Sequence, residues 1–339
     1  MQERMKELVE KLNEYARAYY AFDAPKVSDA EYDALFDELL ALEAETGVTL
    51  PDSPTQRVGS EPLAAFEQQT HQARLWSMDK VRTRAQLVEW GARVERLRAE
   101  YNAANNAVLP PVRYALEYKF DGLTVNLTYE NGRLVRGATR GNGVVGEAIL
   151  PQIKTIRSLP LTIPFQGKME VQGECYMRLS VLETLNRTGE EQLKNARNAA
   201  AGALRNLDPQ VTASRHLDAF FYQIGYIEGR SFETQQDMLA FMKENGLNIS
   251  PFVCPAQTIE EALKAVHEIE QKRETLDFLI DGATIKITDM RTREVLGTTD
   301  KFPRWSIAFK FPAQETVTKL LKITWEVGRT GKLTPLAHV

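Results

Sequence analysis

Three neighbouring segments read as β-strands and set the strongest limit on the fold: residues 112–118, 123–129 and 133–139. They are rich in β-branched and aromatic residues, which favour strands. Asn131-Gly132 lies between the last two segments and is typical of a two-residue hairpin turn, which joins antiparallel strands. We therefore expect an α+β fold with mostly antiparallel strands rather than a regular βαβ alternation.

The first of these strands runs into a charged stretch centred on Lys119. Because side chains alternate along a strand, Lys119 shares one face with Glu117 and Asp121. The other face then carries Tyr118 and Phe120. The charged row is either a solvated sheet face or a site with a nucleophilic lysine. An ammonium group cannot attack, so the second reading needs nearby cations or desolvation to lower the lysine pKa against the pull of the two carboxylates.

Two later predicted strands each carry a single lysine whose neighbours on the same face are small. These neighbours are Gly282 and Thr284 for Lys286, and Ser306 and Ala308 for Lys310. Small side chains leave room for a ligand beside the ammonium group, although a surface lysine is the alternative in each case. With Lys119, the two lysines suit nucleotidyl transfer, because they could lower its pKa and hold an α-phosphate. A divalent cation held partly by carboxylates would complete such a site.

Other charged side chains suit contacts with a nucleotide or a nucleic acid. Arg140 precedes a glycine-rich turn and offers a planar fork for phosphate, although the turn fits neither the Walker nor the dinucleotide-binding pattern. Glu174, on a predicted strand, could meet a ribose hydroxyl or a metal, or simply stand at a sheet edge. Arg197 and Arg205 lie near one face of an alanine-rich helix, so both could address one anionic strand, with solvated arginines as the alternative.

The first 45 residues or so predict two helices, with a capping box at Ser28 and Glu31 between them. This hairpin is acidic and rich in tyrosine. Its polar and aromatic side chains gather at Tyr19, Tyr20, Asp29, Tyr32 and Asp33. They either pack along the seam of the two helices or form a pocket for a cationic aromatic ring, in which tyrosines stack and carboxylates balance the charge.

Composition places the chain among ordinary globular proteins: 339 residues suggest about two domains, and 26% of the residues are charged. Residues 1–50 hold 5 Lys or Arg and 12 Asp or Glu, which leaves 37 and 34 for the rest. Any surface for a polyanion is therefore a local patch on the later part. Cys175 and Cys254 stand alone and indicate neither a disulfide framework nor a zinc site. No apolar run is long enough to span a membrane and no signal peptide is visible, so we expect a cytoplasmic location.

The motifs described above occur in the order of a known family. The chain resembles the lysine-dependent nucleotidyltransferases, which include DNA ligases, RNA ligases and capping enzymes. This resemblance rests on Glu117 to Gly122, Thr139-Arg140-Gly141, Gly173-Glu174, Ile280-Asp281-Gly282 through Lys286, and Phe309-Lys310-Phe311. Narrower similarities to bacterial NAD-dependent DNA ligase run over Tyr19 to Asp33, Arg197 to Gly202, and Arg304 to Pro312. The resemblance covers nearly the whole chain and implies an ATP-grasp-like ligase core.

The resemblance also implies roles for the candidate residues. Lys119 would take AMP from NAD and release nicotinamide mononucleotide (NMN), with Asp121 assisting the lysine or a metal. The NMN half would be held by Tyr19, Tyr20, Asp29, Tyr32 and Asp33. The AMP half would meet Ser77 and Met78 beside the adenine, Glu117 at its amino group, and Arg140, Glu174, Lys286 and Lys310 at ribose and phosphates. Arg197 and Arg205 would face phosphates of the cofactor or of nicked double-stranded DNA. The implied ion is Mg²⁺, or Mn²⁺ in its place, with Asp121 and Glu174 as candidate ligands.

The chain departs from the family pattern at several positions. Phe120 replaces an aliphatic residue, and Asn142 and Ala148 stand where aspartate is common. Residues 76–81 are a loose version of a more regular segment. None of these changes removes a nucleophile or a phosphate ligand, but Asn142 puts in doubt any charge-based role for its loop.

The resemblance ends within the opening strands of an oligonucleotide-binding (OB) barrel. We expect a helical NMN-binding domain with a linker (1–70), a nucleotidyltransferase domain (71–316) and a truncated start of the OB domain (317–339). Zinc would bind only in the missing C-terminal part, which would also hold a helix-hairpin-helix region and a BRCT domain. Such a fragment, expected to be a monomer acting at the bacterial nucleoid in replication and repair, should adenylate itself but seal nicks weakly or not at all.

Two other functions stay open. An ATP-using ligase or capping-type nucleotidyltransferase would not need the acidic, tyrosine-rich hairpin. A catalytically silent nucleic-acid-binding protein on the same scaffold would not need Lys119, Lys286 and Lys310 together.

Overall fold

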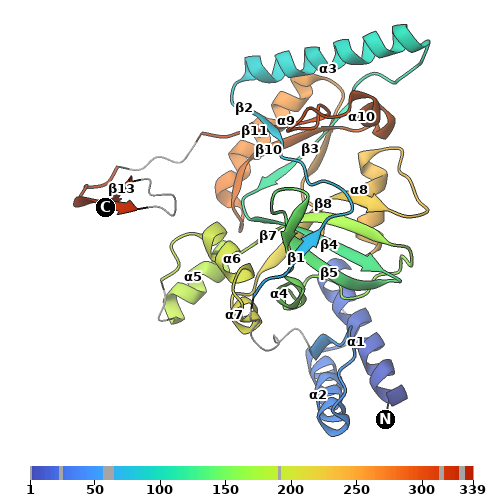
Figure 1. Cartoon of the computed structure of the whole chain (residues 1–339), viewed down its shortest axis with the longest axis vertical. Helices are drawn as coiled ribbons and strands as arrows, with labels where there is room; N and C mark the ends of the chain where they lie inside the picture. The colour runs from blue at the N-terminus through green and yellow to red at the C-terminus, as the bar shows by residue number, and fades with distance from the viewer. Residues whose placement is uncertain are drawn as a thin grey trace.

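Two mostly antiparallel β-sheets form the centre of the computed structural model of the chain (Figure 1). The structure describes residues 2–22, 26–55, 65–189, 192–312, 317–327 and 333–338, without the side chains at positions 17, 19–22, 29 and 30. The predicted α+β class is confirmed. Within these ranges, no helix combines the length and the apolar character that crossing a membrane requires.

The N-terminal unit is the predicted helical hairpin, made of α1 (Gln2–Phe22) and α2 (Asp29–Thr46). The capping box is present, because the Glu31 N–H donates to the Ser28 hydroxyl and the Glu31 carboxylate accepts from the Ser28 N–H. Gly47 ends α2 in the left-handed region at φ 65°. The core of this unit consists of Met5, Leu8, Val9, Leu12 and Leu39.

The larger sheet has five strands in the order β2-β11-β10-β3-β9. Their bounds are Asp79–Val81 for β2, Tyr114–Phe120 for β3, Val253–Ala256 for β9, Ile280–Ile287 for β10 and Ser306–Lys310 for β11. Neighbours are antiparallel except β2 and β11, which are parallel. A shared apolar cluster joins this sheet to α3 (Arg84–Asn105), α9 (Ile259–Lys272) and α10 (Met290–Leu296), with a 3₁₀ turn, η2 (Arg273–Thr275), after α9.

The second large sheet has four antiparallel strands in the order β5-β4-β7-β8. Their bounds are Leu123–Glu130 for β4, Arg133–Thr139 for β5, Met169–Tyr176 for β7 and Asp218–Ile227 for β8. Its core is shared with α4 (Leu150–Lys154), α5 (Leu179–Thr188), α6 (Ala196–Leu204) and α8 (Gln235–Glu244), and α7 (Pro209–Ser214) contacts α4 and α6. Residues 68–70, placed in the linker by the sequence, form β1 (Gln68–Thr70), which pairs with β6 (Val145–Glu147).

The turn between β4 and β5 is the hairpin turn predicted from Asn131-Gly132. Both residues lie in the left-handed region, Asn131 at φ 50° and Gly132 at φ 74°. A Cβ on Gly132 would lie 2.8 Å from the carbonyl oxygen of Ile163, so this position needs glycine for space as well.

Strand β3, which precedes this hairpin, extends two residues beyond its predicted end and contains Lys119 next to its last residue.

Near the C-terminus, β12 (Lys322–Val327) and β13 (Leu333–His338) form a separate antiparallel pair. Apolar side chains of this pair are solvent-exposed, with Trp325 at 65%. The described residues form no closed barrel here. The assignment of these strands to the start of an OB domain stays a prediction.

Candidate active site

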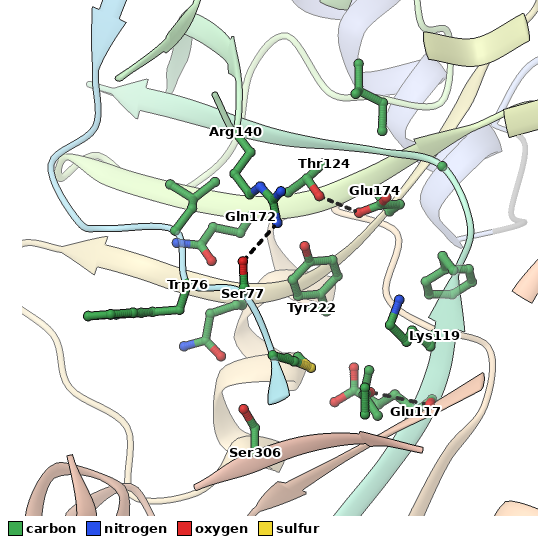
Figure 2. Close-up of a pocket in the computed structure, with 18 of the residues that line it drawn as sticks. Trp76, Ser77, Glu117, Lys119, Thr124, Arg140, Gln172, Glu174, Tyr222 and Ser306 are labelled. Carbon is green, nitrogen blue, oxygen red and sulfur yellow. Dashed lines mark hydrogen bonds between the residues drawn. The ribbon is translucent and has the colours of Figure 1, made fainter. Parts of the chain in front are cut away.

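A cavity of about 680 Å³ is lined by both large sheets and by the segment from residue 73 to residue 78 (Figure 2). One wall comes from β3, β10 and β11, and the other from β4, β7 and β8. The cavity collects eleven of the residues nominated from the sequence: Ser77, Met78, Glu117, Lys119, Asp121, Arg140, Glu174, Arg197, Arg205, Lys286 and Lys310. Residues far apart along the chain meet here because the sheets pair strands that are distant in sequence.

Alternate side chains of β3 lie on opposite faces of the sheet, as the sequence predicts. Lys119 lines the cavity, and Glu117 beside it is 1% exposed. On the opposite face Tyr118 and Phe120 are buried, and the Phe120 ring stacks on Phe220 of β8 at a centroid distance of 4.6 Å. The charged row is therefore part of a cavity wall and not a solvated sheet face.

Two lysines share one row of the five-stranded sheet. Gly282 of β10 pairs in register with Lys119 of β3 on one side and with Lys310 of β11 on the other. A Cβ on Gly282 would lie 2.0 Å from the carbonyl oxygen of Phe309. Only glycine therefore allows β10 and β11 to approach this closely between the two lysines.

Asp281, which has no predicted role although it belongs to one of the sequence motifs, joins these two lysines. Its Oδ1 lies 2.8 Å from Lys119 Nζ, and its Oδ2 lies 2.8 Å from Lys310 Nζ. Burial opposes ionisation of the Asp281 carboxyl, but the two ammonium groups outweigh burial and hold its pKa below its usual value. Asp281 is thus an ionised bridge that fixes the lysine row.

Glu117 and Lys286 form a buried ion pair at the other end of the same wall. Lys286 Nζ lies 3.0 Å from each carboxylate oxygen, and each residue is 1% exposed. Burial lowers the pKa of Lys286, although the Glu117 carboxylate acts in the opposite direction. Lys286 and Lys310, the two cations expected to lower the Lys119 pKa, are thus each paired with a carboxylate.

Two residues that no sequence motif indicated contact this ion pair. Gln235 Nε2 donates to Glu117 Oε1 at 2.8 Å. The carbonyl oxygen of Tyr222 accepts from Lys286 Nζ at 3.1 Å, and Figure 2 shows the Tyr222 ring standing in the cavity. Tyr222 lies on β8, a strand rich in aromatic residues. No local motif separates such a ring from a core ring, so only the packing of the two sheets reveals it.

The carboxylates nominated as metal ligands have protein partners. Asp121 pairs with Arg197 at 3.1 Å, whereas the nearest carboxylate to Lys119 is Asp281. Glu174 Oε2 accepts from the Thr124 hydroxyl at 3.0 Å (Figure 2). Burial raises the pKa of Glu174 to about 7, against the weaker opposing effects of that hydroxyl and of nearby cations. Among the described residues, no three His, Cys, Asp or Glu side chains group to hold a metal ion, so these side chains do not by themselves fit a metal site.

Arg140 projects into the cavity from the turn after β5 and donates to the Ser77 hydroxyl at 3.5 Å (Figure 2). The turn is tight, as its glycines indicate: Gly141 has φ 56°, and a Cβ there would lie 1.9 Å from the carbonyl oxygen of Val145. No ion pair ties Arg140 to a carboxylate within the described ranges. Its guanidinium is therefore available to an anionic ligand. Arg205, by contrast, pairs with Glu147 at 3.0 Å.

Only two side chains of the predicted hairpin pocket, those of Tyr32 and Asp33, belong to the described part of the structure. Neither of them lines the cavity, and the side chains of Tyr19, Tyr20 and Asp29 lie outside that part. The segment after α2 instead contacts the side of the domain that carries α4 and β5 (Figure 1). There Asp52 pairs with Arg133 at 3.2 Å, and Lys154 Nζ donates to the Pro51 carbonyl oxygen at 2.7 Å.

A lysine held in a row of cations, in a cavity between two mostly antiparallel sheets, defines the class of a lysine-dependent nucleotidyltransferase. Comparison with known families agrees. Residues 63–314 match the NAD-dependent DNA ligase adenylation domain, and residues 1–59 match the DNA ligase-like, N-terminal NAD⁺-binding domain. The chain belongs to the NAD-dependent DNA ligase adenylation domain family.

Similar curated proteins are named DNA ligase. The DNA ligase of Alkaliphilus metalliredigens (strain QYMF) is 54% identical over 99% of this chain and 50% of its own length. A DNA ligase of Clostridium botulinum (strain 657 / Type Ba4) is 50% identical over 99% of this chain and 51% of its own length. The chain thus spans about half the length of these relatives. The ligase domain from M. tuberculosis LigD superposes with a TM-score of 0.37 at 13% identity, over 58% of this chain and 55% of that one, which is too weak to carry an argument.

Proposed function

We propose that this chain is an adenylation module that transfers AMP from NAD to Lys119. The deprotonated Nζ attacks the α-phosphorus, a P–N bond forms, and the P–O bond to the NMN phosphate breaks. NMN leaves with the electron pair of that bond, and the proton of Nζ passes to a nearby base or to water. The observation that carries this proposal is the position of Lys119 in the cavity, opposite Arg140 and beside Lys310.

Asp281 holds the nucleophile and is the nearest acceptor for its proton, at 2.8 Å from Nζ. Its second partner, Lys310, is half-exposed at the cavity and meets an oxygen of the α-phosphate. Arg140 meets the same phosphate or the ribose from the opposite wall. Charge that develops on the phosphate oxygens is thereby met by fixed cations that need little reorganisation.

The adenosine part of AMP extends from the α-phosphate toward the end of the cavity away from Lys119. Glu117 accepts from the adenine amino group, while the Tyr222 ring packs on the face of the base. Lys286, which the resemblance placed at the ribose and phosphates, is held at Glu117 and therefore faces an adjacent ring nitrogen. Ser77 and Met78 border the base, and Glu174 lies on the ribose side. These assignments rest on the lining of the cavity and on the donor and acceptor character of each group.

The NMN half is bound by the helical hairpin through Tyr19, Tyr20, Asp29, Tyr32 and Asp33. Support comes from the description of the family matched by residues 1–59, an N-terminal NAD⁺-binding domain. Because Tyr32 and Asp33 do not line the cavity here, the hairpin has to move over it for NAD to react.

The second half of the reaction passes AMP to the 5′-phosphate of nicked double-stranded DNA. Arg197 lies at the cavity and faces phosphates, with Arg205 beside it. The relatives named DNA ligase support DNA as the acceptor, but this chain spans about half of their length. We expect the chain to act as a monomer that adenylates itself and seals nicks weakly or not at all. Mg²⁺ or Mn²⁺ is expected with the substrate phosphates.

Intact mass after incubation with NAD or with ATP, each with magnesium, tests the proposal. We expect one added AMP from NAD alone, reversal by excess NMN, and no addition in Lys119→Ala. Labelling by ATP instead would favour an ATP-using enzyme. An unchanged mass with both nucleotides would favour a silent nucleic-acid-binding scaffold.

A further inference from the structure

The side chain of Ser306 is buried at the cavity, yet its hydroxyl has no partner. The residue is 1% exposed, and Oγ makes no hydrogen bond within the described ranges. Burying a hydroxyl without a hydrogen-bond partner costs free energy, because its hydrogen bonds to water are lost. Such a group in a folded protein therefore indicates a ligand or water that binds there. Ser306 lines the cavity, and Figure 2 shows its oxygen directed into it. A ligand atom is therefore the expected partner.

Strand register fixes how far Ser306 lies from the reacting group. Lys119 and Lys310 share the row of Gly282, whereas Ser306 pairs with Lys286, four residues further along the sheet. At about 3.3 Å per residue the two rows are about 13 Å apart. A nucleotide whose α-phosphorus lies at Lys119 and which extends along this wall therefore brings its base toward Ser306.

The polar groups around Ser306 are largely committed to one another. The Glu117 carboxylate accepts two hydrogen bonds from Lys286 and one from Gln235. The Thr284 hydroxyl, between the two rows, donates to the Glu117 carbonyl oxygen at 3.4 Å. The carboxylate of Glu117 thus has little capacity left for an amino group with two N–H donors. A second acceptor is needed at this end of the wall.

We infer that Ser306 is a specificity-determining residue whose hydroxyl accepts a hydrogen bond from the exocyclic amino group of adenine. The inference rests on the proposed use of NAD and adds a contact beyond the paired Glu117 and Lys286. Because the contact lies far from the reacting phosphorus, it acts on binding of the dinucleotide and not on the rate of bond formation. It distinguishes adenine from bases that lack the amino group.

The test compares Ser306→Ala with the wild-type chain in single-turnover adenylation, with NAD and with an analogue in which purine, without the amino group, replaces adenine. With NAD, the half-saturating concentration should rise about twofold to tenfold, the range for a neutral hydrogen bond, while the maximal rate stays unchanged. With the purine analogue, the two proteins should have equal half-saturating concentrations.

Thr284→Val is the matched control, because its hydroxyl lies on the same wall but already has a protein partner. It should affect NAD and the purine analogue equally. Ser306→Cys, similar in size to serine, gives a second measurement if Ser306→Ala fails to fold. An unchanged half-saturating concentration for NAD, or an equal rise with both dinucleotides, would overturn the role of Ser306. A wild-type chain that NAD does not label would instead overturn the proposed function.

Discussion

Replacing Lys286 with methionine should destabilise the adenylation domain by about 3–5 kcal/mol. The Nζ atom lies 3.0 Å from both oxygens of Glu117, and each of the two residues is 1% exposed. Methionine removes the ammonium group and leaves a buried carboxylate with Gln235 as its side-chain donor. Such an uncompensated buried charge is the reason for the large cost. For a domain of this size the loss corresponds to a fall of about 6–20 °C in Tm.

Urea unfolding followed by tryptophan fluorescence measures this loss as a free energy of unfolding. Lys310→Met is the matched control, because its Nζ lies 2.8 Å from Asp281 but its side chain is 34% exposed. A partly exposed pair should contribute less than about 1 kcal/mol. Combining Lys286→Met with Glu117→Leu should recover most of the lost stability, since the buried charge is then gone. Equal losses for the two single lysine variants would refute the reasoning.

Three further perturbations follow from the cavity. Lys119→Arg keeps a positive charge beside Asp281 but offers no nucleophilic amine. Intact mass should therefore show no added AMP, whereas calorimetry should still detect binding of NAD. Because burial raises the pKa of Glu174 to about 7, the folded chain binds this proton at pH values where the unfolded chain has lost it. The free energy of unfolding should therefore fall as pH rises from about 4.5 to about 7. Glu174→Gln should remove that slope in urea unfolding, and identical slopes would contradict it. Gly282→Ala places a Cβ 2.0 Å from the Phe309 carbonyl oxygen, so the lysine row must shift. Single-turnover adenylation should then slow by about a hundredfold, and an unchanged rate would contradict the need for glycine.

Local sequence patterns were sufficient to predict those features of the fold that neighbouring residues determine. The alternation around Lys119 predicted which face of β3 meets the cavity, because side chains on a strand must alternate. Asn131-Gly132 predicted its hairpin, since both residues tolerate a positive φ. The capping box at Ser28 and Glu31 predicted the start of α2 for a similar reason, as both partners lie within one helical turn.

Contacts that depend on cross-strand register could not be predicted from local sequence patterns. Asp281 reaches Lys119 and Lys310 because β10 lies between β3 and β11, an order that no single segment encodes. Asp121 lies two residues from Lys119 in sequence, yet it pairs with Arg197 of α6. Tyr222 enters the site from the second sheet, where register shifts between β7 and β8 set its position. The ion-pair partners of these charged groups could therefore be identified only from the tertiary structure.

The position of AMP on the chain tests the central claim most directly. The chain is incubated with NAD and magnesium, digested, and the adenylated peptide is sequenced by tandem mass spectrometry. The account predicts AMP on Lys119 alone, in a phosphoramidate that acid releases and hydroxide preserves. AMP on Lys310, Lys286 or any other residue would contradict the assignment of Lys119 as the nucleophile.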